Sequence, residues 1–323
     1  MFTSLSKGGN SHLVDSLIVR SARSVSSEQS DEINERGKVN HATHPRNTAS
    51  RAGTSASFLG RADLGFLSAR DVVHVGSLAS QLAGPQVPVI CDADTGFGGA
   101  PQVARTVQEY WRAGIAALHI EDQVATKRCG HLDSKQLVGQ DDFIARIKAA
   151  SHARDQLCNA DVQDRIVVIA RTDALAGLGL DEAVSRLKMA RDAGADVGFL
   201  EGMTTDAEVH RARSLLKDWP LLANCVTGGK SPLWTASDCK ELGFSIAIFP
   251  TAGLFPAARA LQHSYAHLLS TGIGAEAATD ESRSVDVGGA DPRGLRKFFV
   301  DMGLEDEVAL DRLAADGTGL GAV

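Results

Sequence analysis

A series of short apolar runs, alternating with helical patterns from about residue 85 onward, limits the fold more than any other feature. Each run is apolar at successive positions, as expected of a strand covered on both faces of a parallel sheet. The alternation predicts βα units, and therefore either an open doubly wound sheet or a (β/α)8 barrel. The runs are Val87–Cys91, Ala116–Ile120, Ile166–Ala170, Val197–Leu200, Leu221–Val226 and Phe244–Phe249.

Ordinary helix signals separate these runs. Pro101 suits the first turn of one helix, and Thr235 with Asp238 predicts a capping box at the start of another. A closed barrel needs eight strands, so two more are required from upstream sequence. Leu13–Arg20 is a candidate for one of them, whereas His41–Ser50 is typical of a loop.

Composition excludes several classes of protein. The chain of 323 residues is long enough for a large core, and its net charge of −7 argues against a nucleic-acid partner. It has no run of 18 uncharged apolar residues, so no membrane span is expected. Five widely spread cysteines without a CxxC pair favour free thiols in a reducing compartment. We therefore expect a cytoplasmic protein; the early Arg20 and Arg23 make a mitochondrial location the alternative.

Carboxylates gather where the predicted strands end. Asp92, Asp94 and Glu121 follow the first two runs, and later runs end in Arg171-Thr172-Asp173, in Glu201 and in Asn224. The carboxyl ends of parallel strands share one rim, where clustered carboxylates repel each other unless a cation lies among them. A hard cation with oxygen ligands, such as Mg²⁺, fits this set. The alternative is that these acids cap the helices that follow.

A polar loop follows Glu121, with the sequence Lys127-Arg128-Cys129-Gly130-His131. Its positive neighbours favour the thiolate form of Cys129 and prepare that side chain for proton transfer. The sequence therefore predicts a mobile loop with a catalytic cysteine. The alternative is a solvated basic turn with an incidental cysteine.

These motifs together resemble the isocitrate lyase and phosphoenolpyruvate mutase superfamily, over residues from about 50 to 270. The resemblance implies a (β/α)8 TIM barrel, incomplete or remodelled at its first strands, with C-terminal helices. It divides the chain into an atypical, partly disordered segment 1–50, a catalytic barrel 51–270 and a helical extension with a flexible tail 271–323. The matching motifs are KRCGH, DADTGFGG at Asp92–Gly99, HIEDQ at His119–Gln123, ARTDA at Ala170–Ala174, LLANCVTGGKSP at Leu221–Pro232 and the segment Ala52–Ser57.

The resemblance also implies a role for each matching residue. Asp92 would bind Mg²⁺ directly, with Mn²⁺ as the alternative metal, and Asp94, Glu121 and Asp63 would hold the waters of the metal. Arg171 would bind a substrate carboxylate, for which its fork is suited. The main-chain N–H groups of Ala52 and Gly53 would bind a carboxylate too, and Asn224 and Thr227 the distal part of the substrate. Cys129 would act as general acid on a gating loop, flanked by Lys127 and His131.

The implied activity is Mg²⁺-dependent cleavage of a carbon–carbon bond in a small 2-hydroxy or 2-oxo di- or tricarboxylate, as in methylisocitrate and dimethylmalate lyases. Oxaloacetate hydrolysis is the first alternative. A phosphonate mutase is the second, and those enzymes resemble one another in having Asn in place of Cys129. A catalytically impaired homologue that serves as an oligomer partner is the third. The resemblance implies a homotetramer with swapped C-terminal helices.

Arg51 departs from the family pattern, which usually has Gly at this position. Residues 1–50 also do not resemble the opening helix and first strands of the family. Because Thr43–Ser50 has no apolar run, the sequence predicts that the segment before Arg51 has lost its strand pairing. We would then expect weaker binding of substrate than the resemblance suggests.

Overall fold

The computed structural model of the chain describes residues 48–84, 87–126, 135–157, 165–272 and 294–314. These residues belong to two compact units, Met1–Leu254 and Phe255–Val323. The first unit contains the sheet and the strand ends on which the sequence places a site. The division into segments 1–50, 51–270 and 271–323 stays a prediction.

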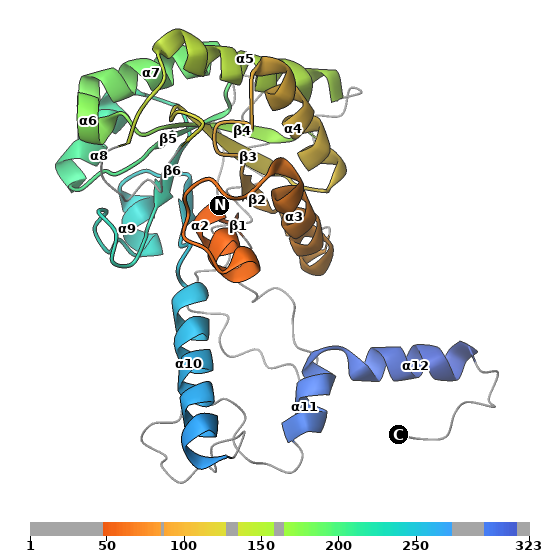
Figure 1. Cartoon of the computed structure of the whole chain (residues 1–323). Coiled ribbons are helices and arrows are strands. Elements are labelled where there is room, and N and C mark those ends of the chain that lie inside the picture. The colour runs from red at the N-terminus through yellow and green to blue at the C-terminus, as the bar shows by residue number, and fades with distance from the viewer. Residues whose placement is uncertain (1–47, 85–86, 127–134, 158–164, 273–293, 315–323) are drawn as a thin grey trace, which may run out of the picture. The chain divides into compact units, whose positions relative to one another are not determined.

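A curled sheet of parallel strands forms the first unit (Figure 1). In the described part of the chain it has seven strands, paired in sequential order from β1 to β7. Each of the six apolar runs overlaps one strand, so the prediction of a parallel (β/α)-barrel fold is confirmed. The strands are β1 (Thr48–Ala49), β2 (Ile90–Asp92), β3 (Ala117–Glu121), β4 (Val167–Thr172), β5 (Val197–Leu200), β6 (Leu221–Asn224) and β7 (Ile246–Ile248).

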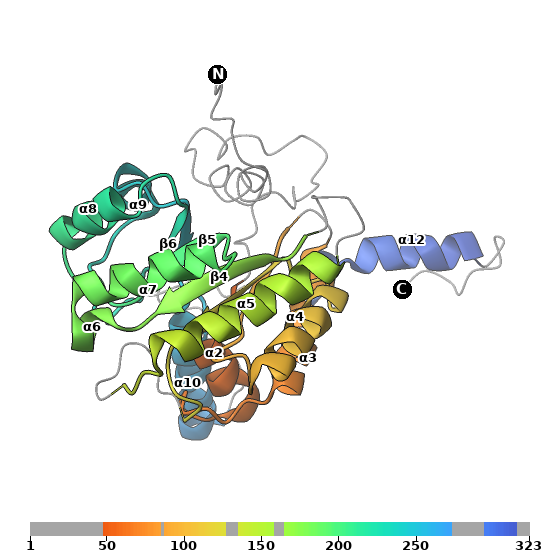
Figure 2. The same cartoon turned by 90° about the horizontal axis from the view of Figure 1, so that it is seen from above.

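Helices cover the outer face of this sheet, as Figures 1 and 2 show. In α4, the residues Val103, Val107 and Tyr110 recur at helical spacing and are buried toward the core. The capping box predicted at Thr235 and Asp238 starts α9. The helices of this unit are α2 (Arg51–Thr54), the π-helix η2 (Ser55–Leu59), α3 (Ala69–Ala83), α4 (Ala100–Arg112), α5 (Gln140–Leu157), α6 (Leu175–Leu178), α7 (Leu180–Asp192), α8 (Asp206–Leu215) and α9 (Ala236–Glu241).

The strands are apolar at successive positions because both faces of the sheet are buried. In β4, Val168 and Ala170 belong to the core between sheet and helices, whereas Val167 and Ile169 belong to a second core. This second core consists of strand residues, with Val197, Phe199 and Leu222 among them, and fills the inside of the curled sheet. Alternate residues of one strand therefore serve two cores.

The short strand β1 corrects the expectation for the segment before Arg51. Thr48 and Ala49 pair in parallel with Ile90 and Cys91 of β2, so the prediction that this segment lacks strand pairing is wrong for these two residues. Main-chain pairing needs no apolar run, and two residues are too few to show a period. Leu13–Arg20, the other candidate strand, lies outside the described residues.

The C-terminal unit contains three helices in its described part. They are α10 (Leu254–Thr271), which begins at the last residue of the first unit, α11 (Gly294–Asp301) and α12 (Leu304–Ala314). None of the residues of α10 is buried, although Leu261, Tyr265 and Leu269 are large and apolar. Among the described helices, none combines the length and the apolar character needed to cross a bilayer.

The carboxylate of Asp122, directly after β3, is hydrogen-bonded to the end of β4. Its carboxylate accepts hydrogen bonds from the Thr172 hydroxyl at 2.5 Å, from the Asp173 main-chain N–H at 2.9 Å and from Arg186 Nη1 of α7 at 3.2 Å. Burial raises the pKa of Asp122, and these donors offset the rise only in part. The carboxylate thus joins β3, β4 and α7 inside the protein.

Replacing Asp122 by Ala should destabilise the fold strongly. The change leaves a buried guanidinium, hydroxyl and N–H without this acceptor, a loss on the order of 3–5 kcal/mol in the free energy of unfolding. Urea denaturation measures it. Asp192→Ala, at an exposed residue of α7, is the matched control and should change stability by less than about 0.5 kcal/mol. Equal effects of the two substitutions on the free energy of unfolding would show that the hydrogen bonds of Asp122 do not stabilise the fold.

Candidate functional site

The loop after β2 places two of the predicted metal ligands at the carboxyl end of the sheet. Asp92 ends the strand, and Asp94 follows with φ of 46°, in the left-handed region that few residues other than Gly adopt. The Asp94 N–H donates to Asp92 Oδ1 at 2.8 Å, and the Asp94 carbonyl accepts from the Glu121 N–H at 2.7 Å. The first bond shapes the loop itself, and the second ties it to the end of β3.

Gly96 explains why the loop turns so sharply. Its φ is 87°, and a Cβ at this position would collide with Val103 of α4. The turn therefore packs its backbone directly on the following helix. This close packing keeps Asp92 and Asp94 in place.

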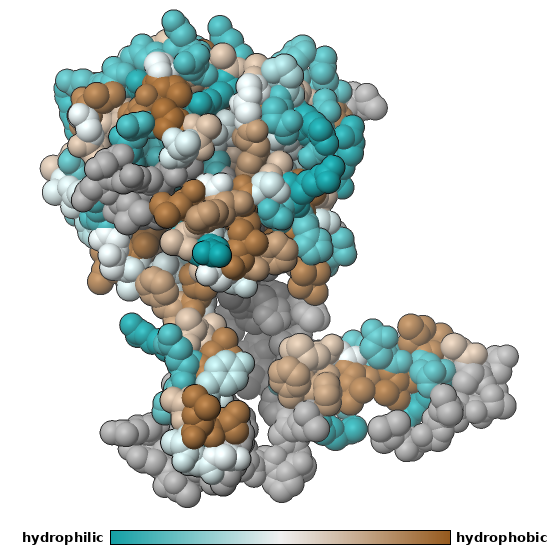
Figure 3. Space-filling view, viewed as in Figure 1, coloured by the Kyte–Doolittle hydropathy of each residue, from teal (hydrophilic) through white to brown (hydrophobic). Residues whose placement is uncertain are grey.

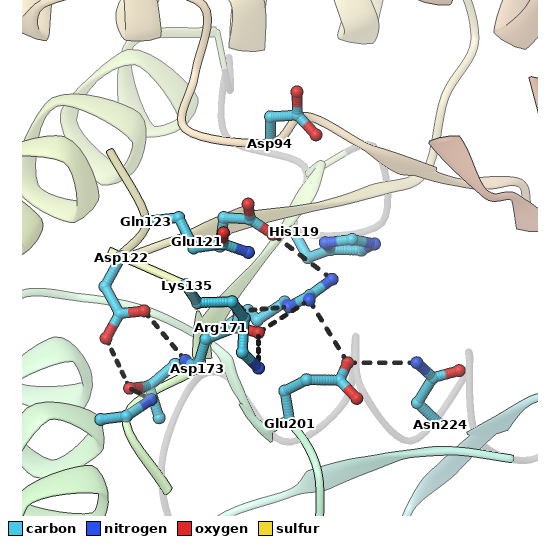
Figure 4. Close-up of polar contacts among 12 residues, drawn as sticks. Asp94, His119, Glu121, Asp122, Gln123, Lys135, Arg171, Asp173, Glu201 and Asn224 are labelled. Atoms are coloured by element: carbon cyan, nitrogen blue, oxygen red, sulfur yellow. Dashed lines mark hydrogen bonds and ion pairs between the residues drawn. The ribbon is translucent and has the colours of Figure 1, made fainter. Parts of the chain in front are cut away.

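The predicted metal ligands at the strand ends are buried. Asp92, Asp94 and Glu121 are each less than a tenth exposed, and Asp63 is half-buried in the loop after η2. In the described part of the chain, no three His, Cys, Asp or Glu side chains lie as a group that would ligate one metal directly. Figure 4 shows Asp94 apart from the linked side chains around Arg171. The role of the four predicted ligands in metal binding stays a prediction.

Arg171 lies at the centre of the linked side chains (Figure 4). It stands at the carboxyl end of β4, and its Nε and Nη2 donate to the two oxygens of Asp173 at 2.9 and 3.1 Å. Its Nη1 lies 3.3 Å from Glu121 Oε2, and its Nη2 lies 3.4 Å from Glu201 Oε2. Burial alone would lower the pKa of Arg171, but the negative charges of these carboxylates outweigh it and raise the pKa well above its ordinary value.

Glu201 and Asn224 continue this network across the next strands. Glu201 directly follows β5, and its Oε2 accepts a hydrogen bond from Asn224 Nδ2 at the end of β6, at 3.1 Å. The structure therefore brings Asn224 to the same rim as Arg171. Thr227, the other residue predicted to bind the distal part of the substrate, is exposed in the turn beyond β6.

Lys135 adds a second cation to the rim. Its Nζ donates to Asp173 Oδ1 at 2.8 Å, and both side chains are buried. Burial alone would raise the pKa of Asp173, but the charges of Arg171 and Lys135 outweigh it and lower the pKa. Asp173 is therefore an ionised carboxylate shared between two cations.

The segment predicted to bind a substrate carboxylate forms the start of α2. The Gly53 N–H donates to Ser50 Oγ at 3.1 Å, so a hydroxyl already accepts from a group expected to bind substrate. Ala52 and Gly53 are half-buried. Arg51 is the first residue of α2, and its side chain is not among those described.

The three residues predicted to lie on a gating loop are outside the described residues. These are Cys129, Lys127 and His131, within 127–134. Their predicted roles stay predictions. Lys135 is the first described residue after them, and its side chain reaches the rim.

The sequence placed Asp173 and Glu201 at the rim but indicated no role for them, and it indicated none for Asp122 or Lys135. For Asp173 and Glu201 a signal existed, because both follow predicted strands in the same way as Asp92 and Glu121. Lys135 had no such signal. It follows no strand, and only the folded chain brings it to Asp173 across 38 positions of sequence.

Comparison with known proteins agrees with this geometry. The family model "Phosphoenolpyruvate phosphomutase" matches residues 45–269. The chain is 40% identical to a 2,3-dimethylmalate lyase of Eubacterium barkeri, over 65% of this chain and 69% of that protein. It is 36% identical to a 2-methylisocitrate lyase of Vibrio cholerae, over 69% of this chain and 71% of that protein.

A solved structure gives the same picture for the fold. An oxaloacetate acetylhydrolase in complex with the inhibitor 3,3-difluorooxalacetate superposes with a TM-score of 0.72 and 40% sequence identity, over 83% of this chain and 85% of that chain. The family model covers well over half of the chain. The chain therefore belongs to the phosphoenolpyruvate mutase/isocitrate lyase superfamily.

Proposed function

We propose that this protein is a Mg²⁺-dependent carbon–carbon lyase that acts on a small 2-hydroxy di- or tricarboxylate, of the kind named by its dimethylmalate and methylisocitrate lyase relatives. The observation that carries the proposal is the buried guanidinium of Arg171 at the centre of the rim, reached from three strand ends. A guanidinium fork pairs well with a substrate carboxylate. Relatives at 36 and 40% identity support the reaction class.

The charges at the rim support a requirement for a metal. Apart from Asp122, which is bound to Thr172 and Arg186, five buried carboxylates lie at the ends of β2 to β5, whereas the described cations among them are Arg171 and Lys135. A polycarboxylate substrate would add further negative charge to this set. A divalent cation at the rim would offset that charge, so substrate and metal would bind together. The five are Asp92, Asp94, Glu121, Asp173 and Glu201.

The donor set fits Mg²⁺, with Mn²⁺ as the alternative. All its members are carboxylates, the hard oxygen donors that Mg²⁺ prefers, and Mg²⁺ commonly binds one or two carboxylates and keeps several waters. Asp92 would bind the metal directly, while Asp94, Glu121 and Asp63 would hold its waters. When bound, the metal supplies an electrophile that offsets negative charge developing on the substrate.

The side chains of the chain itself would then orient the substrate and move a proton. Arg171 would hold one carboxylate, and the Gly53 N–H would exchange its bond to Ser50 Oγ for a bond to substrate. Asn224 would bind the distal part of the substrate, together with Thr227 if its turn comes inward. A base would first take the proton of the substrate hydroxyl, and the carbon–carbon bond would then break to leave a carbonyl and an enolate. Cys129 would donate its proton to the carbon of that enolate.

Oxaloacetate hydrolysis is the second candidate function. The observation that favours it is the likeness to the oxaloacetate acetylhydrolase structure, at an identity equal to that of the dimethylmalate lyase. Phosphonate mutase activity ranks lower, because those enzymes resemble one another in having Asn in place of Cys129. A catalytically impaired homologue is also less favoured, since β1 pairs with β2.

The exposed apolar side chains of α10 support a homo-oligomer, and we propose a tetramer with exchanged C-terminal helices. Figure 3 shows hydrophobic residues on the visible face of this helix. Phe255, Leu261, Tyr265 and Leu269 are each more than two-fifths exposed, which is uncommon for a helix face in contact only with water. We also propose a cytoplasmic location, supported by the free thiols of Cys91, Cys225 and Cys239.

Assays of the purified protein with 2,3-dimethylmalate, 2-methylisocitrate and oxaloacetate test the reaction and its metal. We expect cleavage of a 2-hydroxy polycarboxylate that EDTA abolishes and Mg²⁺ restores. Asp92→Asn should lower kcat/KM at least about a hundredfold, because it removes a charged ligand. Asp192→Asn is the control and should be neutral. Full activity in EDTA would contradict the metal proposal, and turnover of oxaloacetate alone would favour the hydrolase.

The role of Cys129 is tested by Cys129→Ser. Loss of the thiol removes the proton donor, so kcat should fall about a hundredfold or more while thermal unfolding stays unchanged. Cys158→Ser, at a cysteine outside the motif, controls for loss of a thiol in general. If Cys129→Ser turns over substrate at the rate of the unmodified chain, that cysteine is not the acid.

Light scattering coupled to size exclusion tests the oligomer. We expect a mass of about four chains, and a smaller species for Leu261→Glu, because a charge on the apolar face of α10 opposes burial. Leu82→Glu, at an exposed leucine of α3, is the control. A monomeric mass for the unmodified protein would show that α10 serves another purpose.

A further inference from the structure

Lys135 is held firmly by the main chain around it. The Val124 N–H donates to the Gln136 carbonyl, and the Val138 N–H donates to the Asp122 carbonyl, each at 2.9 Å. Gln123 and Leu137 form an antiparallel bridge between the same stretches. The backbone next to Lys135 is thus fixed to the end of β3, and its side chain reaches the rim from this fixed base.

The carboxylate of Asp173 links Lys135 to Arg171. Its Oδ1 accepts from Lys135 Nζ at 2.8 Å and from Arg171 Nη2 at 3.1 Å, and its Oδ2 accepts from Arg171 Nε at 2.9 Å. The carboxylate is fully buried, and Figure 4 shows it between the two cations. Two parallel bonds to Asp173 fix the plane of the guanidinium, since a bidentate pair sets orientation as well as distance.

The remaining donors of Arg171 are held less closely. Nη1 lies 3.3 Å from Glu121 Oε2, and Nη2 lies 3.4 Å from Glu201 Oε2. A substrate carboxylate would therefore displace these longer contacts and leave the pair with Asp173 intact. The charge on Asp173 then decides how strongly Arg171 attracts the substrate.

We propose that Lys135 is a positioning residue that acts on Arg171 through Asp173 and so sets the affinity for the substrate carboxylate. By sharing the negative charge of Asp173, Lys135 leaves more of the positive field of Arg171 for the substrate. It also holds the Asp173 carboxylate in the orientation that aligns the guanidinium fork. The inference rests on the proposed function, because it assumes that Arg171 binds a substrate carboxylate.

Substitution of Lys135 by Met and by Arg tests the proposal. Lys135→Met keeps the length of the side chain but removes its charge, and should raise KM about tenfold or more with a smaller change in kcat. Lys135→Arg keeps the charge and should restore KM to within about threefold. Lys148→Met, at an exposed lysine of α5, should leave both constants unchanged. An unchanged KM in Lys135→Met, or a loss confined to kcat, would overturn the proposal.

A double-mutant cycle separates action through Asp173 from direct contact with substrate. In an Asp173→Asn background, Lys135→Met should change KM by less than about twofold, because the link to Arg171 is already broken. If the two effects multiply instead, Lys135 acts on the substrate without Asp173 and the inference is wrong. Circular dichroism and thermal unfolding show whether the variants fold. Should the Asp173 variants not fold, the comparison of Lys135→Met with Lys135→Arg still decides.

Calorimetric titration with oxalate and Mg²⁺ separates this inference from the proposed function. Oxalate is a small dicarboxylate that needs no turnover, and Lys135→Met should weaken its binding about tenfold. If the unmodified protein binds oxalate but cleaves none of the candidate substrates, only the proposed function fails. If both forms bind it equally, only the inference fails. No binding of oxalate by the unmodified protein would overturn both.

Discussion

The arrangement of the rim depends on the ion pairs of Arg171. Parallel strands that end together bring Glu121, Asp173 and Glu201 close to one another inside the protein. Buried carboxylates repel each other and are costly to remove from water, so a positive charge must lie among them. The guanidinium of Arg171 reaches all three because it stands on the central strand β4. Its raised pKa expresses the same balance of charge.

The end of β4 serves two networks at once. Arg171 and Asp173 face the rim, while Thr172 between them donates to Asp122 on the other side. This follows from the alternation of side chains along extended backbone. Asp122 is in turn tied to Arg186 of α7. The three consecutive residues Arg171, Thr172 and Asp173 therefore link the hydrogen bonds of Asp122 to the charged rim. We expect a substitution in one of the two networks to affect the other.

Much of the fold was predictable from the sequence. The two cores require apolar residues at successive positions of each strand, and these runs are visible in the sequence. All six apolar runs overlap strands, and the carboxylates at their ends are buried at one rim. β1 was not predicted, since its two residues pair through the main chain, which leaves no mark on side-chain choice. Lys135 was not predicted either, because its partner is distant in sequence. The strand-end pattern placed Asp173 and Glu201 at the rim, but it could not show that Asp173 pairs with both Arg171 and Lys135.

The left-handed backbone at Asp94 limits which residues the position tolerates. At φ of 46°, Gly, Asn and Asp are accommodated with little strain, whereas longer or branched side chains are not. Gly would fit the backbone but supply no oxygen, and Asn would supply an oxygen without charge. Glu would carry the charge at a greater cost in strain. Asp therefore satisfies both the left-handed backbone conformation and the need for a negative charge at position 94. The conformation of the loop restricts substitutions at this position as much as the chemistry of the side chain does.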